Sequence, residues 1–126
     1  MDITQSKPLL LVEDNEVNRE MLVRRLRRAG YEVSSAADGK AALDSVVSEQ
    51  PALVLLDMNL PIKDGWTVAQ EIRSELGLTD LPIIALTAHA MATDRDKALA
   101  AGCDDYATKP IDFPELLNKI ERLLTR

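Results

Sequence analysis

The sequence predicts an α/β protein with a doubly wound, five-stranded parallel sheet covered by helices on both faces. Short apolar runs without polar alternation, such as Leu9–Val12, alternate along the 126 residues with longer stretches of helical period. Uniformly apolar runs are typical of strands buried on both faces, and strands that alternate with helices form a parallel sheet. Five such units favour the strand order 2-1-3-4-5, an inference from chain size and precedent.

The first unit begins with the strand 9–12. A helical period follows over residues 15–29, where Asn15 is the predicted N-cap and Gly30 fits the left-handed position that ends a helix. Two pairs of apolar residues spaced four apart indicate the helical period: Val17 with Met21, and Leu22 with Leu26.

The second and third units follow the same pattern. Residues 31–36 are the second strand and residues 38–49 the second helix, with Leu43, Val46 and Val47 facing inward and Pro51 preventing its continuation. Residues 52–56 are the third and most apolar strand. Residues 58–65 form a loop, and a third helix runs to about residue 76.

The last two units complete the chain. Residues 82–86 are the fourth strand, and Thr93 with Asp96 predicts a capping box for a fourth helix that ends at residues 101–102. Residues 105–108 give a short fifth strand. The fifth helix, which reaches the C-terminus, is predicted from an apolar stripe: Phe113, Leu116, Leu117, Ile120 and Leu124.

Composition narrows the classes of function. One domain is expected over residues 1–126, with a structured core at about residues 8–125 and no output domain. The formal net charge of −6 argues against a nucleic-acid binder, which needs a surplus of Lys and Arg. The sequence has neither an apolar run of the roughly 18 residues that cross a membrane nor a signal-peptide core. The single cysteine, Cys103, favours a reduced, cytoplasmic setting in which this thiol is buried and inert.

Chemically useful side chains follow four of the five predicted strands. Glu13 and Asp14 come after the first strand, Asp57 after the third, Thr87 after the fourth and Lys109 after the fifth. Ligands of open α/β sheets bind outside the carboxyl ends of the strands, near the point where the winding reverses. In the order 2-1-3-4-5 the first and third strands are neighbours, so the three carboxylates are expected to converge there.

Three adjacent carboxylates repel one another unless a cation lies between them. A hard divalent ion with oxygen ligands removes that repulsion, and Mg²⁺ typically takes one or two carboxylates, waters and a phosphate oxygen. Lys109 and Thr87 suit the oxygens of a phosphoryl group, and a carboxylate can itself be the nucleophile. A lone Asp after a strand is usually a cap or turn residue, but five suitable residues on four strands favour an aspartyl phosphate on Asp57.

These residues lie in four motifs: LLLVEDNEVNRE, LLDMNLPIKDG, PIIALTAHAM and DDYATKPI. Together they resemble the receiver domain of response regulators, the phosphoacceptor module of two-component signalling, over essentially the whole chain. The closest likeness is to single-domain, chemotaxis-regulator-like proteins of phosphorelays and to receivers of hybrid histidine kinases. The resemblance also implies the flavodoxin-like arrangement of the sheet.

The resemblance implies that Asp57 accepts a phosphoryl group from a partner's phosphohistidine. It further implies that Glu13, Asp14, Asp57 and the backbone carbonyl of Asn59 arrange Mg²⁺, or Mn²⁺ in its place. Glu13 stands where many relatives have Asp, and its extra methylene suggests that it reaches the metal through water. Thr87 and Lys109 are implied to hold the phosphoryl oxygens.

Four further expectations come from the resemblance. The Lys109–Pro110 bond is expected to be cis, and Thr87 with Tyr106 is expected to form a switch that responds to phosphorylation. Asn59 and His89 are expected to tune the rate of hydrolysis. The implied partners are a histidine kinase or a histidine phosphotransfer protein, and a downstream protein that contacts the fourth helix, fifth strand and fifth helix.

Specific residues argue against the competing classes of protein. A haloacid-dehalogenase-like phosphatase needs a second Asp where this chain has Asn59, which cannot shuttle a proton. A flavodoxin-like electron carrier needs a hydroxyl- and glycine-rich loop after the first strand, and the acidic residues there would repel phosphate. An interaction module that is never phosphorylated has no need for the complete set of five residues. A phosphate-relay receiver excised from a hybrid histidine kinase stays open as an alternative.

Overall fold

Five parallel strands form one sheet in the order β2-β1-β3-β4-β5, which confirms the predicted topology. The structure is a computed structural model that describes residues 7–88 and 92–126. The strands are short and all lie within two residues of their predicted bounds: β1 (Leu9–Val12), β2 (Val33–Ala36), β3 (Leu53–Asp57), β4 (Ile83–Thr87) and β5 (Asp105–Thr108). The predicted α/β, doubly wound class is therefore correct.

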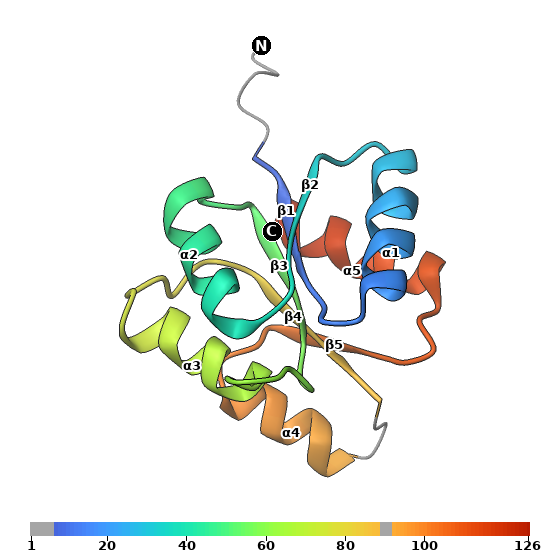
Figure 1. Ribbon diagram of the computed structural model, residues 1–126. Helices are drawn as coiled ribbons and strands as arrows, with labels where there is room; N and C mark the ends of the chain where they lie inside the picture. Colours follow the sequence, from blue (N-terminus) through green and yellow to red (C-terminus); the bar gives the residue numbers. More distant parts are fainter. Residues whose placement is uncertain (1–6, 89–91) are drawn as a thin grey trace.

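Helices cover both faces of the sheet (Figure 1). Their bounds are α1 (Glu16–Arg28), α2 (Gly39–Glu49), α3 (Gly65–Ser74), α4 (Ala92–Ala100) and α5 (Phe113–Thr125). α1 and α5 share one buried apolar cluster, and α2, α3 and α4 share another on the opposite face. The right-handed crossovers of successive βαβ units place helices on both faces in this way.

The three central strands, β1, β3 and β4, lack polar alternation because each supplies side chains to both clusters. In β1, Leu9 and Leu11 point into the cluster beneath α1 and α5, whereas Leu10 and Val12 point into the other cluster. All four side chains are buried. Successive side chains of a strand face opposite sides of the sheet, so a strand covered on both sides must be apolar throughout.

Acidic and amide caps begin four of the helices. The Asn15 side chain accepts a hydrogen bond from the Asn18 amide at 2.9 Å, which confirms the predicted cap of α1. Asp38, Asp64 and Asp112 cap α2, α3 and α5 in the same manner. The capping box predicted at Thr93 is wrong, because α4 already begins at Ala92 and Thr93 therefore lies inside the helix.

Three apolar residues of the first two helices are exposed, among them Val47, which the sequence predicts to face inward. Leu22 and Leu26 of α1 are buried, but Val17 is 73% exposed and Met21 47% exposed. Both pairs have the four-residue spacing, yet they lie on different sides of the helix, because one residue turns a helix by about 100°. The same displacement leaves Val47 exposed beside the buried Val46.

In the fifth helix, α5, one residue of the predicted apolar stripe is also exposed. Leu116 and Ile120 are fully buried, and Leu123 packs against the same cluster as they do. Leu124, which was predicted to face inward, is instead 37% exposed. The buried stripe continues from residue 120 to residue 123, a spacing of three. Leu124 is one residue further along the helix, so its side chain turns toward water.

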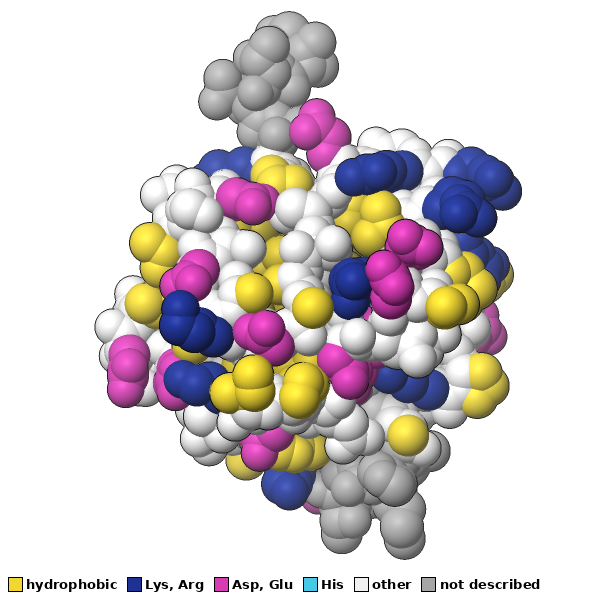
Figure 2. All heavy atoms as spheres, viewed as in Figure 1, with side chains coloured by type: hydrophobic (Ala, Val, Ile, Leu, Met, Phe, Trp, Pro, Cys, Tyr) yellow, Lys and Arg dark blue, Asp and Glu magenta, His cyan; other side chains and the backbone are white. Residues whose placement is uncertain are grey.

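Arginine side chains gather near the end of α1 (Figure 2). The Arg25 guanidinium lies 4.2 Å from the centroid of the Phe113 ring, and Arg27 donates a hydrogen bond to the Val33 carbonyl at 3.0 Å. These contacts tie α1 to α5 and to β2. Positive charge near the end of a helix also interacts favourably with its carbonyl groups.

In the described part of the chain, no helix has both the length and the apolar character needed to cross a membrane.

Cys103 provides a test of the packing behind β5. This side chain is 5% exposed, and burial raises the pKa of its thiol to about 12. We expect the thiol of the folded protein to react with a disulfide reagent at pH 8 at least roughly a hundred-fold more slowly than in the unfolded chain. Equal rates in buffer and in denaturant would show that Cys103 is not buried.

Candidate functional site

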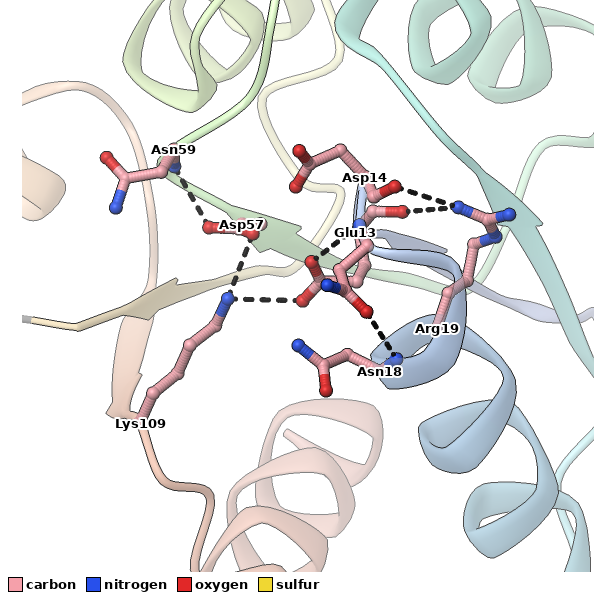
Figure 3. Close-up of polar contacts among 8 residues, drawn as sticks. Glu13, Asp14, Asn18, Arg19, Asp57, Asn59 and Lys109 are labelled. Atoms are coloured by element: carbon pink, nitrogen blue, oxygen red, sulfur yellow. Dashed lines mark hydrogen bonds and ion pairs between the residues drawn. The ribbon is translucent and has the colours of Figure 1, made fainter.

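The carboxyl edge of the sheet brings the predicted acidic residues together (Figure 3). Glu13 and Asp14 follow β1, and Asp57 is the last residue of β3. Since Val12 of β1 pairs with Leu56 of β3, the residues that follow these two are neighbours. One carboxylate oxygen from each of Glu13, Asp14 and Asp57 lies within 4.8 Å of the others. The predicted convergence of the three carboxylates is confirmed.

Lys109 reaches this cluster from the end of β5. Its ammonium lies 2.9 Å from Asp57 Oδ2 and 3.1 Å from Glu13 Oε1. Both carboxylates are almost fully buried, whereas Lys109 is half-buried. The Lys109 amide donates to the Thr87 carbonyl at 2.8 Å, and the Lys109–Pro110 bond is cis, the isomer that the resemblance implies.

Asp57 is held at both of its carboxylate oxygens. Oδ1 accepts a hydrogen bond from the Asn59 amide at 2.9 Å, and Oδ2 faces Lys109. The start of α3 passes so close that a Cβ on Gly65 would lie 2.5 Å from the Asp57 carbonyl oxygen. Glycine at position 65 therefore allows the loop after β3 to close tightly behind this side chain, where the Gly65 amide donates to the Met58 carbonyl.

The two acids of the β1–α1 loop have different surroundings. Glu13 is 1% exposed, and its Oε2 accepts a hydrogen bond from the Asn15 amide at 3.1 Å. Asp14 is exposed at the mouth of the cluster. The sheet thus fixes Glu13 inside the site, whereas the Asp14 carboxylate stands open to solvent. The suggested contact of Glu13 with a metal through water stays a prediction.

The electrostatics of the cluster favour an added cation. Burial raises the pKa of Glu13 and the Asp57 charge adds to this effect, while the Asn15 amide and the Lys109 ammonium only partly offset it. For Lys109, burial acts to lower the pKa, but hydrogen bonds and charge from Asp57 and Glu13 outweigh burial and raise it. Lys109 is therefore firmly protonated at neutral pH. The Lys109 ammonium pairs with Glu13 and Asp57, and Asp14 adds a third carboxylate, so the cluster retains an excess of negative charge.

The ligand atoms of the cluster are suited to a hard divalent cation. Glu13, Asp14 and Asp57 supply oxygen atoms only, and neither His nor Cys belongs to the group. Magnesium prefers carboxylate, carbonyl and water oxygens and keeps several of its waters, which the exposed position of Asp14 permits. The side chains present therefore fit Mg²⁺.

The other predicted residues lie nearby or outside the described residues. Thr87 ends β4 and is 4% exposed, and Tyr106 on β5 is half-buried against the cluster beneath α2, α3 and α4. The Lys119 ammonium lies 4.8 Å from the centroid of the Tyr106 ring. His89 lies outside the described residues. The roles assigned to Thr87, Tyr106, Asn59 and His89 stay predictions.

Sequence reasoning missed three groups that contact the acidic residues. Two are backbone amides, those of Asn15 and Asn59, whose positions no side-chain pattern can reveal. The third is Arg19, whose Nη1 donates to the carbonyl oxygens of Glu13 at 2.9 Å and Asp14 at 3.4 Å. An arginine one turn into the helix after an acidic loop is the pattern that could have indicated this contact.

Comparisons with known proteins agree on one family. The family model described as the response regulator receiver domain matches residues 9–121. The chain is 45% identical over 127 aligned positions to "Probable transcriptional regulator ycf27" of Cyanophora paradoxa, covering 100% of this chain and 51% of that protein. It is 36% identical to the "DNA-binding dual master transcriptional regulator RpaA" of Synechocystis, covering 94% of this chain and 49% of that protein. The chain thus spans about half the length of these curated relatives.

A solved structure adds a likeness at the site itself. The receiver domain of the sensor histidine kinase PA1611 from Pseudomonas aeruginosa superposes with a TM-score of 0.87 at 39% sequence identity. The match covers 96% of this chain and 99% of that one, and that receiver domain holds a magnesium ion coordinated in its active-site cleft.

The raised pKa of Glu13 gives a prediction for the metal-free protein. The folded state binds the proton of this carboxyl more tightly than the unfolded chain, so ionising Glu13 costs stability. We expect the Tm of Glu13→Gln to exceed that of the wild type by a few degrees at pH 7 in a chelator. The difference should shrink as pH falls through the raised pKa toward the ordinary value of 4.5.

Glu20→Gln, a change at an exposed position of α1, is the matched control and should leave the Tm nearly unchanged. A Glu13→Gln variant that is less stable than the wild type at pH 7 would show that the ion pair with Lys109 outweighs the burial of the carboxylate.

Proposed function

The chain belongs to the response regulator receiver domain family, and on this premise we propose that it accepts a phosphoryl group on Asp57. One observation carries the proposal: Asp57 is buried between the acidic residues of the β1–α1 loop and the Lys109 ammonium, which lies 2.9 Å away. The family also sets aside the phosphatase and electron-carrier alternatives. The chain is a signalling domain rather than an enzyme, with self-phosphorylation and slow self-dephosphorylation as its own chemistry.

The proposed step is an in-line displacement at phosphorus. A carboxylate oxygen of Asp57 attacks the phosphorus of the donor's phosphohistidine, a phosphorus–oxygen bond forms, and the phosphorus–nitrogen bond breaks. The imidazole leaves with the electron pair of the broken bond. The Asn59 amide and the Lys109 ammonium hold the two Asp57 oxygens in fixed directions before the donor arrives. Such preorganised groups need little rearrangement when charge develops on the phosphoryl oxygens.

Lys109 and Thr87 supply the contacts to the transferred group in this proposal. The ammonium already lies against Asp57 Oδ2, so it can neutralise a phosphoryl oxygen attached there. The Thr87 hydroxyl, at the end of the neighbouring strand β4, is the donor for another phosphoryl oxygen. Asn59 and His89 are the proposed determinants of how long the aspartyl phosphate lasts.

Glu13, Asp14, Asp57 and the backbone carbonyl of Asn59 are the proposed ligands of Mg²⁺, with Mn²⁺ as a substitute. When bound, the ion would neutralise charge on the carboxylates and on the phosphoryl group. The ligand atoms of the acidic cluster support this part of the proposal.

The proposed phosphodonor is a histidine kinase or a histidine phosphotransfer protein in the cytoplasm. The proposed output is a contact between a downstream protein and the face formed by α4, β5 and α5, changed by a rearrangement of Thr87 and Tyr106. Relatives named as transcriptional regulators, of about twice this length, support a regulatory output. A relay role is the second candidate, favoured by the 39% identity to the receiver domain of a sensor histidine kinase.

Phosphorylation of Asp57 can be tested with a small-molecule donor. We expect acetyl phosphate with Mg²⁺ to label the wild type and to leave Asp57→Asn unlabelled, because Asn keeps the shape of the side chain without its nucleophile. Asp14→Asn should fold normally but require roughly ten-fold more Mg²⁺ for the same labelling. Labelling is measured by a phosphate-affinity gel.

Asp64→Asn is the matched control, because Asp64 lies in the loop that follows Asp57 but caps α3. It should be labelled at the wild-type rate. Labelling of Asp57→Asn at that same rate would contradict the proposal.

Conformational output and relay can be separated with beryllofluoride, a mimic of the aspartyl phosphate. If the domain is a switch, NMR shift changes should extend from Asp57 to Tyr106 and to α4 and α5, and Thr87→Ala should abolish the distant changes. If the mimic binds and shifts only the residues around Asp57, the relay role replaces the switch.

A further inference from the structure

Arg19 folds back from α1 onto the loop that carries two of the three carboxylates (Figure 3). Its Nη1 donates to the Glu13 carbonyl at 2.9 Å and to the Asp14 carbonyl at 3.4 Å. Arg19 is half-buried, whereas residues 14–18 and residue 20 are exposed. Arg19 is therefore the one partly buried residue at the start of α1, where the neighbouring side chains face water.

The partners of Arg19 are backbone carbonyls, not carboxylates. A guanidinium beside three carboxylates would ordinarily pair with them, because the paired geometry is strong. Here the acidic side chains point toward Asp57 and Lys109, and Arg19 lies on the opposite side of the loop (Figure 3). Arg19 thus adds positive charge near the cluster without covering an oxygen that could bind a cation.

The loop is held at several points, and Arg19 contributes side-chain contacts from α1. The Glu13 amide donates to the Ala36 carbonyl of β2 at 3.1 Å, and the Glu13 side chain accepts from the Asn15 amide. The Arg19 guanidinium fixes the carbonyls of both acidic residues, so it constrains the peptide planes from which their side chains leave the chain. Asp14, whose side chain is exposed, has the greatest need of this constraint.

We propose that Arg19 is a positioning residue for a divalent cation at the acidic cluster. By holding the Glu13 and Asp14 carbonyls, Arg19 orients the two carboxylates toward the ion and offsets part of their repulsion in its absence. This role rests on the metal site of the proposed function. Loss of a group that orients the ligands of a metal typically weakens its affinity by roughly ten- to a hundred-fold.

The competing explanation is that Arg19 only fastens α1 to the loop. That role would lower the Tm of an Arg19 variant equally with and without Mg²⁺, and it would leave Mg²⁺ affinity unchanged in the folded protein. The positioning role predicts weaker Mg²⁺ binding at a temperature where the variant is fully folded.

The experiment titrates Mg²⁺ into wild type, Arg19→Gln and Arg19→Lys by isothermal calorimetry at 15 °C, after circular dichroism has shown that each is folded. We expect the Kd of Arg19→Gln for Mg²⁺ to rise about ten-fold. Arg19→Lys keeps the charge with fewer donors and should lie between the two, and it serves as the test if Arg19→Gln does not fold. Arg24→Gln, at an exposed position of the same helix, is the matched control and should bind like the wild type.

Equal Mg²⁺ affinities in the wild type and both Arg19 variants would overturn the positioning role and leave the proposed function intact. A wild type that does not bind Mg²⁺ would overturn the metal site of the proposed function and the role of Arg19 with it.

Discussion

One ammonium group held between two buried carboxylates is the interaction on which the site depends. Lys109 lies 2.9 Å from Asp57 and 3.1 Å from Glu13, although these residues are 52 and 96 positions apart in the chain. Burying a carboxylate is costly unless it is paired and hydrogen-bonded, so neither acid could occupy this position without Lys109 and the backbone amides. The third carboxylate, Asp14, has no comparable burial. Lys109 therefore pairs with both buried carboxylates, and the exposed Asp14 leaves an excess of negative charge at the mouth of the site.

The rest of the fold brings these groups to one edge and keeps them there. Parallel pairing of β1 with β3, β3 with β4 and β4 with β5 aligns the carboxyl ends of the strands that carry the acids, Thr87 and Lys109. Apolar clusters on both faces make this sheet rigid, because side chains of every strand are packed from above and below. The loops after β1 and β3 carry the rest of the site, and the Arg19 contact and the tight passage at Gly65 hold them in place. A rigid sheet with functional loops at its edge is a common arrangement in α/β proteins.

The sequence was most informative where a single physical constraint decides the structure. A strand packed on both faces must be apolar throughout, so the runs that became β1, β3 and β4 could be recognised, and the residues at their ends identified the acidic cluster. Helix faces were less predictable, because Val17 and Met21 share the spacing of Leu22 and Leu26 but lie on another side of α1. Contacts made by backbone amides, such as those of Asn15 and Asn59, could not be predicted from side-chain patterns. The direction of Lys109 was also beyond the sequence, which indicated a phosphoryl ligand but not its ion pairs with both acids.

The position of the phosphoryl group in the chain can be measured directly. The protein is phosphorylated with Mg²⁺ and a small phosphodonor, the acyl phosphate is reduced with borohydride, and the modified residue is identified by peptide mass spectrometry. An acyl phosphate on an aspartate is reduced to homoserine, so we expect homoserine at position 57 and aspartate at positions 14 and 64. Homoserine at another position, or intact Asp57 in a protein that carries phosphate, would contradict it.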